Sequence, residues 1–188
     1  DIVFTPMISS DAVIHNLTHT LKLAQFKNFE QPIIIQIFGY DGKKILKAIQ
    51  ILDKKLHPAG FDINMGCPAR RICASGSGAA LLLDPKKIYA IAAGIVQRVH
   101  IPVTAKIRIG WDHLSLNYSD TVRALEDAGV SMVFVHGRTR AQQYGGSADW
   151  DMIRNIVLQS KIPIVGNGDI SSYEEAKKRM EFSGCPAV

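Results

Sequence analysis

Short apolar runs rich in β-branched residues recur along this 188-residue chain, and amphipathic segments separate them. The runs repeat at intervals of roughly thirty residues, which is the length of one strand followed by one helix. This pattern predicts a parallel sheet whose strands are joined by helical crossovers. The predicted strands span residues 2–4, 32–38, 61–63, 102–108, 131–136 and 163–167.

Signals that start helices stand between these runs, and apolar residues recur behind them at helical spacing. Asp84 followed by Pro85 is typical of an N-cap with proline at the first helical position. Ser172 with Glu175 three residues later predicts a capping box. Four of the predicted helices begin at Asp41, Asp84, Ser119 and Ser172, and the one from Ser119 is expected to end at Ala128-Gly129.

Two α/β architectures accommodate such repeats, an open doubly wound sheet and a (β/α)8 TIM barrel. An open sheet concentrates its site at one crevice, whereas a barrel places functional groups at the carboxyl ends of many strands. Polar groups follow five successive predicted strands here, which favours the barrel. They are Gln36, Asn64 with Cys67, Lys106 with Arg108, His136 with Arg138, and Asn167-Gly168-Asp169.

The number of repeats is too small for a closed barrel, because six strands cannot close an eight-stranded one. We therefore expect residues 1–188 to form a partial TIM-barrel catalytic domain of about six βα units. On this interpretation the chain is an internal piece of a longer protein.

The composition indicates a globular domain, with 47% hydrophobic and 21% charged residues. No apolar run is long enough to span a membrane. Three cysteines in no CxxC pattern favour a reduced, cytoplasmic setting. The net charge of +5 is a mild bias toward anionic partners and identifies none.

The segment Asn64-Met65-Gly66-Cys67-Pro68 places a thiol on a turn directly after an apolar strand. Free cysteine is often an inert buried residue. The flanking Gly66 and Pro68 favour a turn that lifts this side chain clear of the sheet. A free thiol is mostly protonated at neutral pH, so it suits proton donation at least as well as nucleophilic attack.

Lys106 and Arg108 lie two residues apart on a predicted strand and therefore share a face. Two cations directed into a barrel are costly unless an anion meets them. Pairing with Asp62 or Asp169 is one possibility, but their place beside the cysteine turn favours a ligand.

His136 is also expected at a strand end, where a lone histidine is often only a structural residue. The following Arg138 and Arg140 favour ligand contact for it. Gly166-Asn167-Gly168-Asp169 suits backbone contact with a phosphate, although Asn-Gly-Asp is also an ordinary turn.

His15 and His19 lie four residues apart on a predicted helix, but they lack the glutamate of a zinc-protease motif and a third ligand. We expect them on a surface face, and the sequence predicts no metal site.

These motifs together resemble the tRNA-dihydrouridine synthases, in the order and at the spacing typical of that family. The resemblance covers essentially the whole chain. The motifs are Gln36-Ile37-Phe38-Gly39, Asn64-Met65-Gly66-Cys67-Pro68, Lys106-Ile107-Arg108, His136-Gly137-Arg138-Thr139-Arg140 and Asn167-Gly168-Asp169-Ile170.

The resemblance implies an FMN-containing barrel that reduces uridine in tRNA to 5,6-dihydrouridine, with NADPH as the electron donor. Cys67 would protonate C5 of the uracil while the reduced flavin delivers hydride to C6. The residues expected against the isoalloxazine ring are Gln36, Lys106 and His136. Those expected at the ribityl phosphate are Asn167, Gly168 and Asp169.

The resemblance also implies that Asn64 and Arg108 face the target base. The arginines expected to meet RNA phosphates or bases are Arg70, Arg71, Arg138 and Arg140.

The chain also departs from the family pattern. It lacks the family's first strand, its Gly-Arg-Gly phosphate segment and its C-terminal helical domain, and it has Thr5-Pro6-Met7 where Thr-Glu-Met is commoner. These departures leave open whether this segment alone binds FMN or turns over.

Two other functions stay open. One is a flavin-dependent reductase or dehydrogenase of a free pyrimidine, and the other is a non-catalytic RNA-binding protein.

Overall fold

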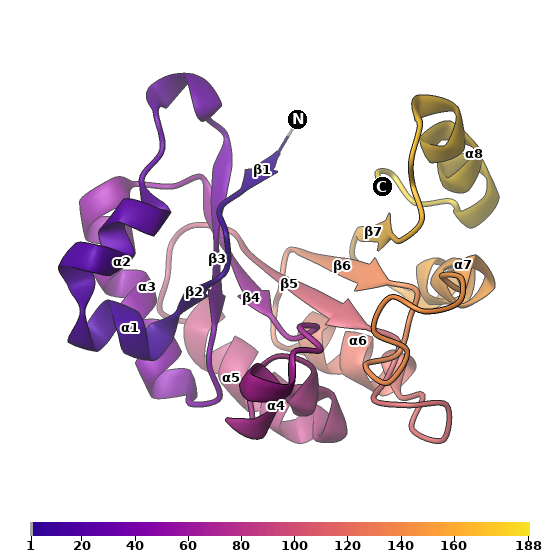
Figure 1. The fold of residues 1–188 in the computed structure, drawn as a ribbon, viewed down its shortest axis with the longest axis horizontal. Helices are drawn as coiled ribbons and strands as arrows, with labels where there is room; N and C mark the ends of the chain where they lie inside the picture. The colour runs from indigo at the N-terminus through magenta and orange to yellow at the C-terminus, as the bar shows by residue number, and fades with distance from the viewer. Residues whose placement is uncertain (1) are drawn as a thin grey trace.

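The backbone forms a curled parallel sheet whose outer side is covered by helices, as a computed structural model describing residues 2–188 shows (Figure 1). The strand order is β1-β3-β4-β5-β6-β7, with β2 beside β3, and every strand pair is parallel. The strands are β1 (Val3–Phe4), β2 (Ile8–Ser9), β3 (Ile33–Phe38), β4 (Gly60–Asn64), β5 (Val103–Arg108), β6 (Met132–His136) and β7 (Ile164–Asn167).

Eight α-helices and two 3₁₀ segments connect the described strands. The helices are α1 (Ser10–His15), α2 (Leu17–Ala24), α3 (Gly42–Leu56), α4 (Arg70–Ala74), α5 (Pro85–Val96), α6 (Tyr118–Asp127), α7 (Trp150–Gln159) and α8 (Tyr173–Ser183). The 3₁₀ segments are η1 (Asn28–Glu30) and η2 (Gly78–Leu83).

The strand order confirms the predicted barrel architecture in place of a doubly wound sheet. A doubly wound sheet reverses its strand order at a switch point, whereas this order follows the chain without reversal. The rings of Phe4 on β1 and Phe134 on β6 meet edge to face with centroids 5.0 Å apart. Three strands separate β1 from β6 along the sheet, so this contact requires the sheet to curl into half of a barrel.

The two faces of the sheet differ because successive side chains on a strand point to opposite sides. The outer face packs on the helices and forms the core, with Ile35, Phe61, Ile63, Ala105, Ile107, Val133 and Val135 fully buried. The inner face carries polar groups on neighbouring strands in register, among them Gln36, Asp62, Thr104, Lys106 and Arg108.

The first strand is interrupted, which the sequence did not predict. Val3–Phe4 and Ile8–Ser9 both pair with β3, and residues 5–7 between them stand opposite residues 35–36. Thr5 Oγ1 accepts the Gln36 N–H at 3.2 Å in place of a backbone carbonyl. This extra residue separates β1, which confirms the predicted strand 2–4, from β2, which was not predicted. Met7 between them lines the cavity at the carboxyl ends of the strands.

Most predicted helix starts are confirmed. Asp41 and Asp84 accept hydrogen bonds from the first turns of α3 and α5, and Pro85 begins α5. Ser172 accepts the Glu175 N–H at 3.1 Å, but the Glu175 carboxylate accepts from Ser171 and Arg179 instead of closing the box.

Two predictions of local structure need correction, and one helix was missed. Helix α6 begins at Tyr118 rather than Ser119, because Asn117 is its N-cap and the chain enters the helix earlier. His15 and His19 lie on two separate helices, since the chain breaks at Asn16, and both are exposed as expected. Helix α7 was not predicted, although its N-cap Asp149 accepts from Met152 N at 2.8 Å.

Candidate active site at the carboxyl ends of the strands

A rigid turn after β4 carries the predicted reactive thiol. Asn64 Oδ1 accepts the N–H groups of Gly66 at 3.2 Å and Cys67 at 2.9 Å. Arg108 Nε donates to Gly66 O at 2.9 Å from the neighbouring strand. A Cβ at Gly66 would lie 3.1 Å from the backbone of Ile107, so any larger residue would push the two strands apart by a few tenths of an ångström. The turn is therefore held from two sides and leaves the Cys67 side chain half-buried.

The thiol faces a cavity of about 280 Å³ at the carboxyl ends of the strands. Six predicted site residues meet there although they come from four strands and the loops after them. They are Asn64, Cys67, Lys106, Arg108, His136 and Asn167.

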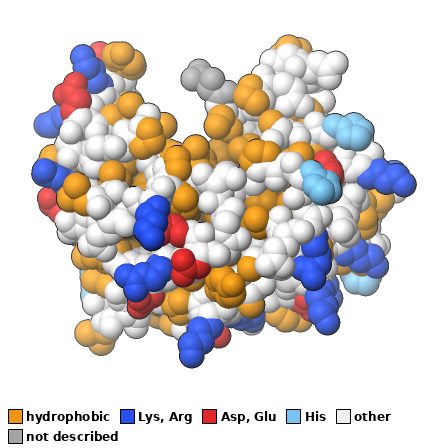
Figure 2. Space-filling view, turned by 180° about the vertical axis from the view of Figure 1, so that it is seen from behind, with side chains coloured by type: hydrophobic (Ala, Val, Ile, Leu, Met, Phe, Trp, Pro, Cys, Tyr) orange, Lys and Arg blue, Asp and Glu red, His pale blue; other side chains and the backbone are white. Residues whose placement is uncertain are grey.

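A larger hollow of about 880 Å³ lies between the two edges of the sheet and shares Lys106 and Asn167 with the first cavity. Figure 2 shows this side of the molecule, with hydrophobic side chains gathered along the hollow. Gln36 lines this hollow rather than the cavity of Cys67. The other inner walls are apolar and include Phe4, Phe134 and Val165.

Lys106 is a cation without an anionic partner. Its Nζ donates to Asn167 Oδ1 at 2.8 Å, and among residues 2–188 it forms no ion pair with a carboxylate. Burial lowers the pKa of Lys106 to about 8, although the charge of Asp62 opposes this shift. The expected alternative, pairing with Asp62 or Asp169, is therefore not formed.

His136 is neutral at physiological pH. Burial lowers its pKa to about 4, and the charges of Arg108, Lys106 and Arg138 act in the same direction. Its Nε2 lies 3.2 Å from Arg138 Nη1, and a guanidinium can only donate. Nε2 therefore accepts and Nδ1 carries the proton. Because Gly168 has no side chain, the backbone after β7 can approach the His136 ring closely, and a Cβ at this position would lie 3.1 Å from the ring.

Arg138 and Asp169 form an ion pair behind the site. Arg138 Nη2 lies 2.6 Å from Asp169 Oδ1 and also donates to Gly146 O at 2.7 Å. The Ala148 N–H bonds the Asp169 carboxylate and, with Arg138, lowers its pKa. These bonds favour a positioning role for both residues. Contact of Arg138 with RNA, and of Asp169 with a phosphate, stays a prediction.

The remaining predicted arginines lie at the surface or in the loops. Arg140 stacks its guanidinium 4.4 Å from the Trp111 ring centroid, a cation–π contact. Arg70 and Arg71 are exposed at the start of α4, two and three residues after Pro68.

Two residues that line the thiol cavity were not predicted, Met7 and Tyr144. Tyr144 is 74% exposed, and its ring lies 6.3 Å from the His136 ring and 5.5 Å from the Arg108 guanidinium. Met7 lies three residues after the predicted strand 2–4 and Tyr144 eight residues after the predicted strand 131–136, so neither stands directly at a strand end, where the pattern places functional groups.

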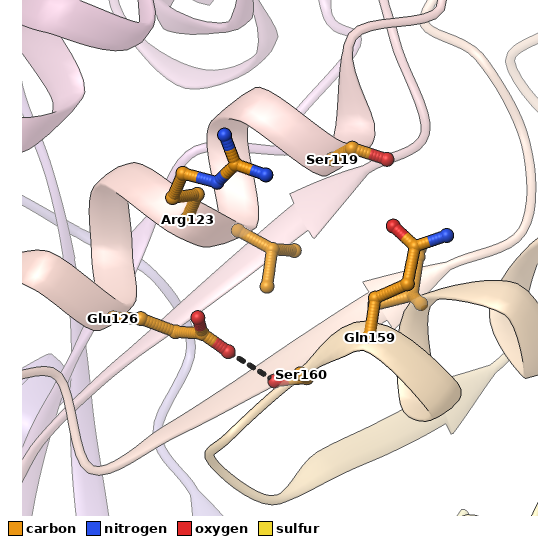
Figure 3. Close-up of a pocket in the computed structure, with 7 residues that line it drawn as sticks. Ser119, Arg123, Glu126, Gln159 and Ser160 are labelled. Carbon is orange, nitrogen blue, oxygen red and sulfur yellow. Dashed lines mark hydrogen bonds between the residues drawn. The ribbon is translucent and has the colours of Figure 1, made fainter.

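A separate small hollow lies between the outer helices α6 and α7 (Figure 3). The Glu126 carboxylate accepts from the Ser160 hydroxyl and from Lys161 N there, so its role is to join the two helices. Within residues 2–188, no three His, Cys, Asp or Glu side chains are grouped to hold a metal ion. No helix in this range is long and apolar enough to cross a bilayer.

Comparison with known proteins identifies one family. The sequence profile described as "Dihydrouridine synthase (Dus)" matches residues 1–188. A probable tRNA-dihydrouridine synthase of Rhizobium leguminosarum bv. phaseoli is 37% identical over 191 residues, covering 100% of this chain and 58% of the relative. The tRNA-dihydrouridine synthase B of Pseudomonas aeruginosa is 37% identical over 186 residues, covering 99% and 56%. The chain thus spans less than two thirds of these relatives.

Solved structures show the same fold at lower sequence identity. The Amycolatopsis orientalis BexX/CysO complex contains a chain with a TM-score of 0.58 and 21% identity, covering 100% of this chain and 68% of that one. A 2,3-dimethylmalate lyase has a TM-score of 0.58 and 14% identity, covering 97% and 74%. These likenesses concern the fold alone.

Proposed function

Because the chain belongs to the dihydrouridine synthase family, we propose that it carries the catalytic site of an enzyme that reduces uridine in tRNA to 5,6-dihydrouridine. The observation that supports this most is the convergence of a thiol, a half-buried lysine and a neutral imidazole around one cavity. The domain proposed from the sequence, a partial TIM barrel over residues 1–188, agrees with the curled sheet.

The inner face fits FMN as the cofactor. Lys106 is half-buried, and the only hydrogen-bond partner of its ammonium group among the described residues is the neutral Asn167. An anionic ring can therefore meet this positive charge. The apolar walls of the larger hollow suit a flat aromatic ring. When bound and reduced, FMN would supply the hydride for C6 of the uracil, with NADPH as the electron donor. Gln36, His136, Asn167 and Gly168 are the other residues proposed to hold it.

Cys67 would donate its proton to C5 of the uracil. The Asn64 side chain fixes the backbone of its turn, and Arg108 fixes the turn from β5. The ring of Tyr144, exposed at the mouth of the cavity, offers a flat apolar surface to a base that has left its stack.

A polyanionic substrate agrees with the charges around the mouth. Arg70 and Arg71 are exposed near the thiol turn, and Arg140 lies on the loop after β6. Arg138 would act indirectly, by holding His136 and Asp169 in place. A tRNA substrate also agrees with the cytoplasmic setting expected from the free cysteines.

Turnover of tRNA by the purified full-length protein tests this function. The protein is incubated with NADPH and tRNA that lacks dihydrouridine, and the product is measured by mass spectrometry. Free uracil and dihydroorotate are assayed under the same conditions as comparison substrates. We expect bound flavin and dihydrouridine in tRNA only. Turnover of a free pyrimidine without tRNA turnover would indicate the free-pyrimidine enzyme, and RNA binding without flavin would indicate a non-catalytic protein.

A further inference from the structure

Asp62 is a fully buried carboxylate for which the proposed reaction has no use. It lies on the inner face of β4 with 0% of its surface exposed. Its oxygens accept from Gln36 Nε2 at 2.8 Å and from Thr104 Oγ1 at 2.7 Å. Both partners are neutral, and Asp62 forms no ion pair within residues 2–188. A carboxylate placed there costs desolvation energy, so its presence needs an explanation.

The hydrogen bonds of Asp62 continue to the thiol turn. Gln36 Oε1 accepts from Asn64 Nδ2 at 2.9 Å. Asn64 Oδ1 in turn accepts the Cys67 N–H at 2.9 Å and the Gly66 N–H at 3.2 Å. Two side-chain amides thus connect the buried carboxylate to the backbone of the cysteine. We call this series of hydrogen bonds, from Asp62 through Gln36 and Asn64 to the Cys67 turn, the relay.

The donor and acceptor roles along this series of hydrogen bonds are set at its Asp62 end. Burial raises the pKa of Asp62, while the bonds from Thr104 and Gln36 and the charge of Lys106 oppose this shift. In its ionised form the carboxylate only accepts, so the Gln36 amide nitrogen then faces Asp62 and its oxygen faces Asn64. The Asn64 nitrogen then faces Gln36, and its oxygen faces the N–H groups of the turn. With the Gln36 amide reversed, the nitrogens of both amides would oppose each other or the Cys67 N–H would lose its acceptor.

We propose that Asp62 is a positioning residue, which orients the side-chain amides of Gln36 and Asn64 and thereby holds the Cys67 turn. The structural part of this proposal, that Asp62 holds the Cys67 turn in place, rests on the observed hydrogen bonds alone. Its consequence for turnover rests on the proposed function.

Hydrogen–deuterium exchange at single-residue resolution in the full-length protein tests the proposal. In Asp62→Leu the Cys67 N–H should exchange about tenfold faster, because its acceptor is no longer oriented. The Met65 N–H is an internal reference, since it bonds Lys106 O at 2.8 Å outside the relay. Its exchange should change less than about threefold. Equal acceleration at both amides, or none at Cys67, would overturn the proposal.

Three further variants separate the relay from general loosening. Gln36→Met interrupts the relay while Asp62 keeps its bond to Thr104, and should accelerate Cys67 exchange as much as Asp62→Leu. This variant keeps the test decisive if Asp62→Leu does not fold. Asp62→Asn can still accept from Gln36 and donate to Thr104, so it should retain protection. Thr104→Val removes the other bond of the carboxylate and should leave Cys67 exchange within about threefold of wild type. Loss of protection in either conservative variant would contradict the assigned direction.

A turnover measurement on the same variants keeps the two hypotheses apart. If the function is correct, Asp62→Leu should lower kcat for dihydrouridine formation by about tenfold or more, with KM for tRNA changed less. Unchanged kcat despite faster Cys67 exchange would refute the catalytic consequence of the relay. Wild-type protein that shows the exchange pattern but makes no dihydrouridine would refute the proposed function and leave the relay standing.

Discussion

The two faces of the central strands carry opposite kinds of side chain, and β5 shows this in adjacent residues. Ile107 points outward, is fully buried and belongs to the hydrophobic core. Lys106 points inward to the thiol cavity and has the neutral Asn167 as its partner. The side chains of the outer face are stabilised by packing, whereas on the inner face Lys106 forms no ion pair with any carboxylate of residues 2–188. Stability therefore resides mainly on one face, and the candidate chemistry on the other.

Truncating the outer face should have the largest effect on the fold. Ile107→Ala should lower the free energy of unfolding by about 2–5 kcal/mol, because it leaves a cavity between the sheet and the helices. The matched control is Lys106→Met at the adjacent inner-face position, which should leave the unfolding free energy unchanged or raise it, since it removes a half-buried charge that has no carboxylate partner among residues 2–188. Chemical denaturation measures both. A larger loss of unfolding free energy for Lys106→Met than for Ile107→Ala would contradict the assignment of stability to the outer face.

Lys106→Met should have the opposite profile in cofactor binding. We expect FMN affinity to fall about 10–100-fold, because the variant lacks the cation that meets the anionic ring. Lys44→Met is the control, since Lys44 already pairs with Asp11 at 2.7 Å on the outer surface. Titration of apoprotein with FMN, followed by flavin fluorescence, measures both variants. Normal affinity in Lys106→Met would assign this lysine a structural role.

The inner face should also give FMN binding a pH dependence. The pKa of Lys106 is about 8 in the free protein, and a bound anion raises it, so the protonated lysine binds FMN better. Affinity should therefore be constant from pH 7 to about 8 and then weaken by at most about tenfold per pH unit. Lys106→Met should lose this dependence between pH 7 and 9.5. A flat profile in the wild type would contradict the unpaired cation.

Arg140→Ala should produce the smallest change. We expect tRNA affinity to fall about two- to fivefold. The slope of log affinity against log salt concentration should decrease in magnitude by about one, as for the loss of one phosphate contact. Arg123→Ala on the outer helix α6 is the matched control and should change neither quantity. Filter binding across a salt series measures both. Equal effects of the two substitutions would mean that Arg140 acts only through net charge.

The sequence predicted the sheet well because its signal is local. All six predicted strands match observed strands to within a residue at each end, since each is a short apolar run between polar breaks. Strand β2 was missed because residues 5–7, which separate it from β1, are arranged by long-range bonds such as the one from Gln36 N to Thr5 Oγ1. Helix α7 was missed although Asp149 is an N-cap of the kind recognised elsewhere in the chain.

The candidate site was predictable where it stands at strand ends and not elsewhere. Register brings Asn64 beside Lys106, and Arg108 beside His136, so their convergence follows from the sheet. Tyr144 lies on a loop held by distant bonds, including Arg108 Nη1 to Gln143 O at 2.7 Å, which no local pattern encodes. Whether these residues hold FMN and uridine stays a prediction.

Replacement of the thiol tests the central claim most directly. Cys67→Ala in the full-length protein should retain the flavin absorbance of the wild type, because the cofactor is proposed to lie against other residues. Dihydrouridine formation in tRNA, measured by mass spectrometry, should fall at least about 100-fold without the proton donor. Cys185→Ala, a buried cysteine outside the cavity, should keep product formation near the wild-type level. Unchanged product in Cys67→Ala would contradict the account.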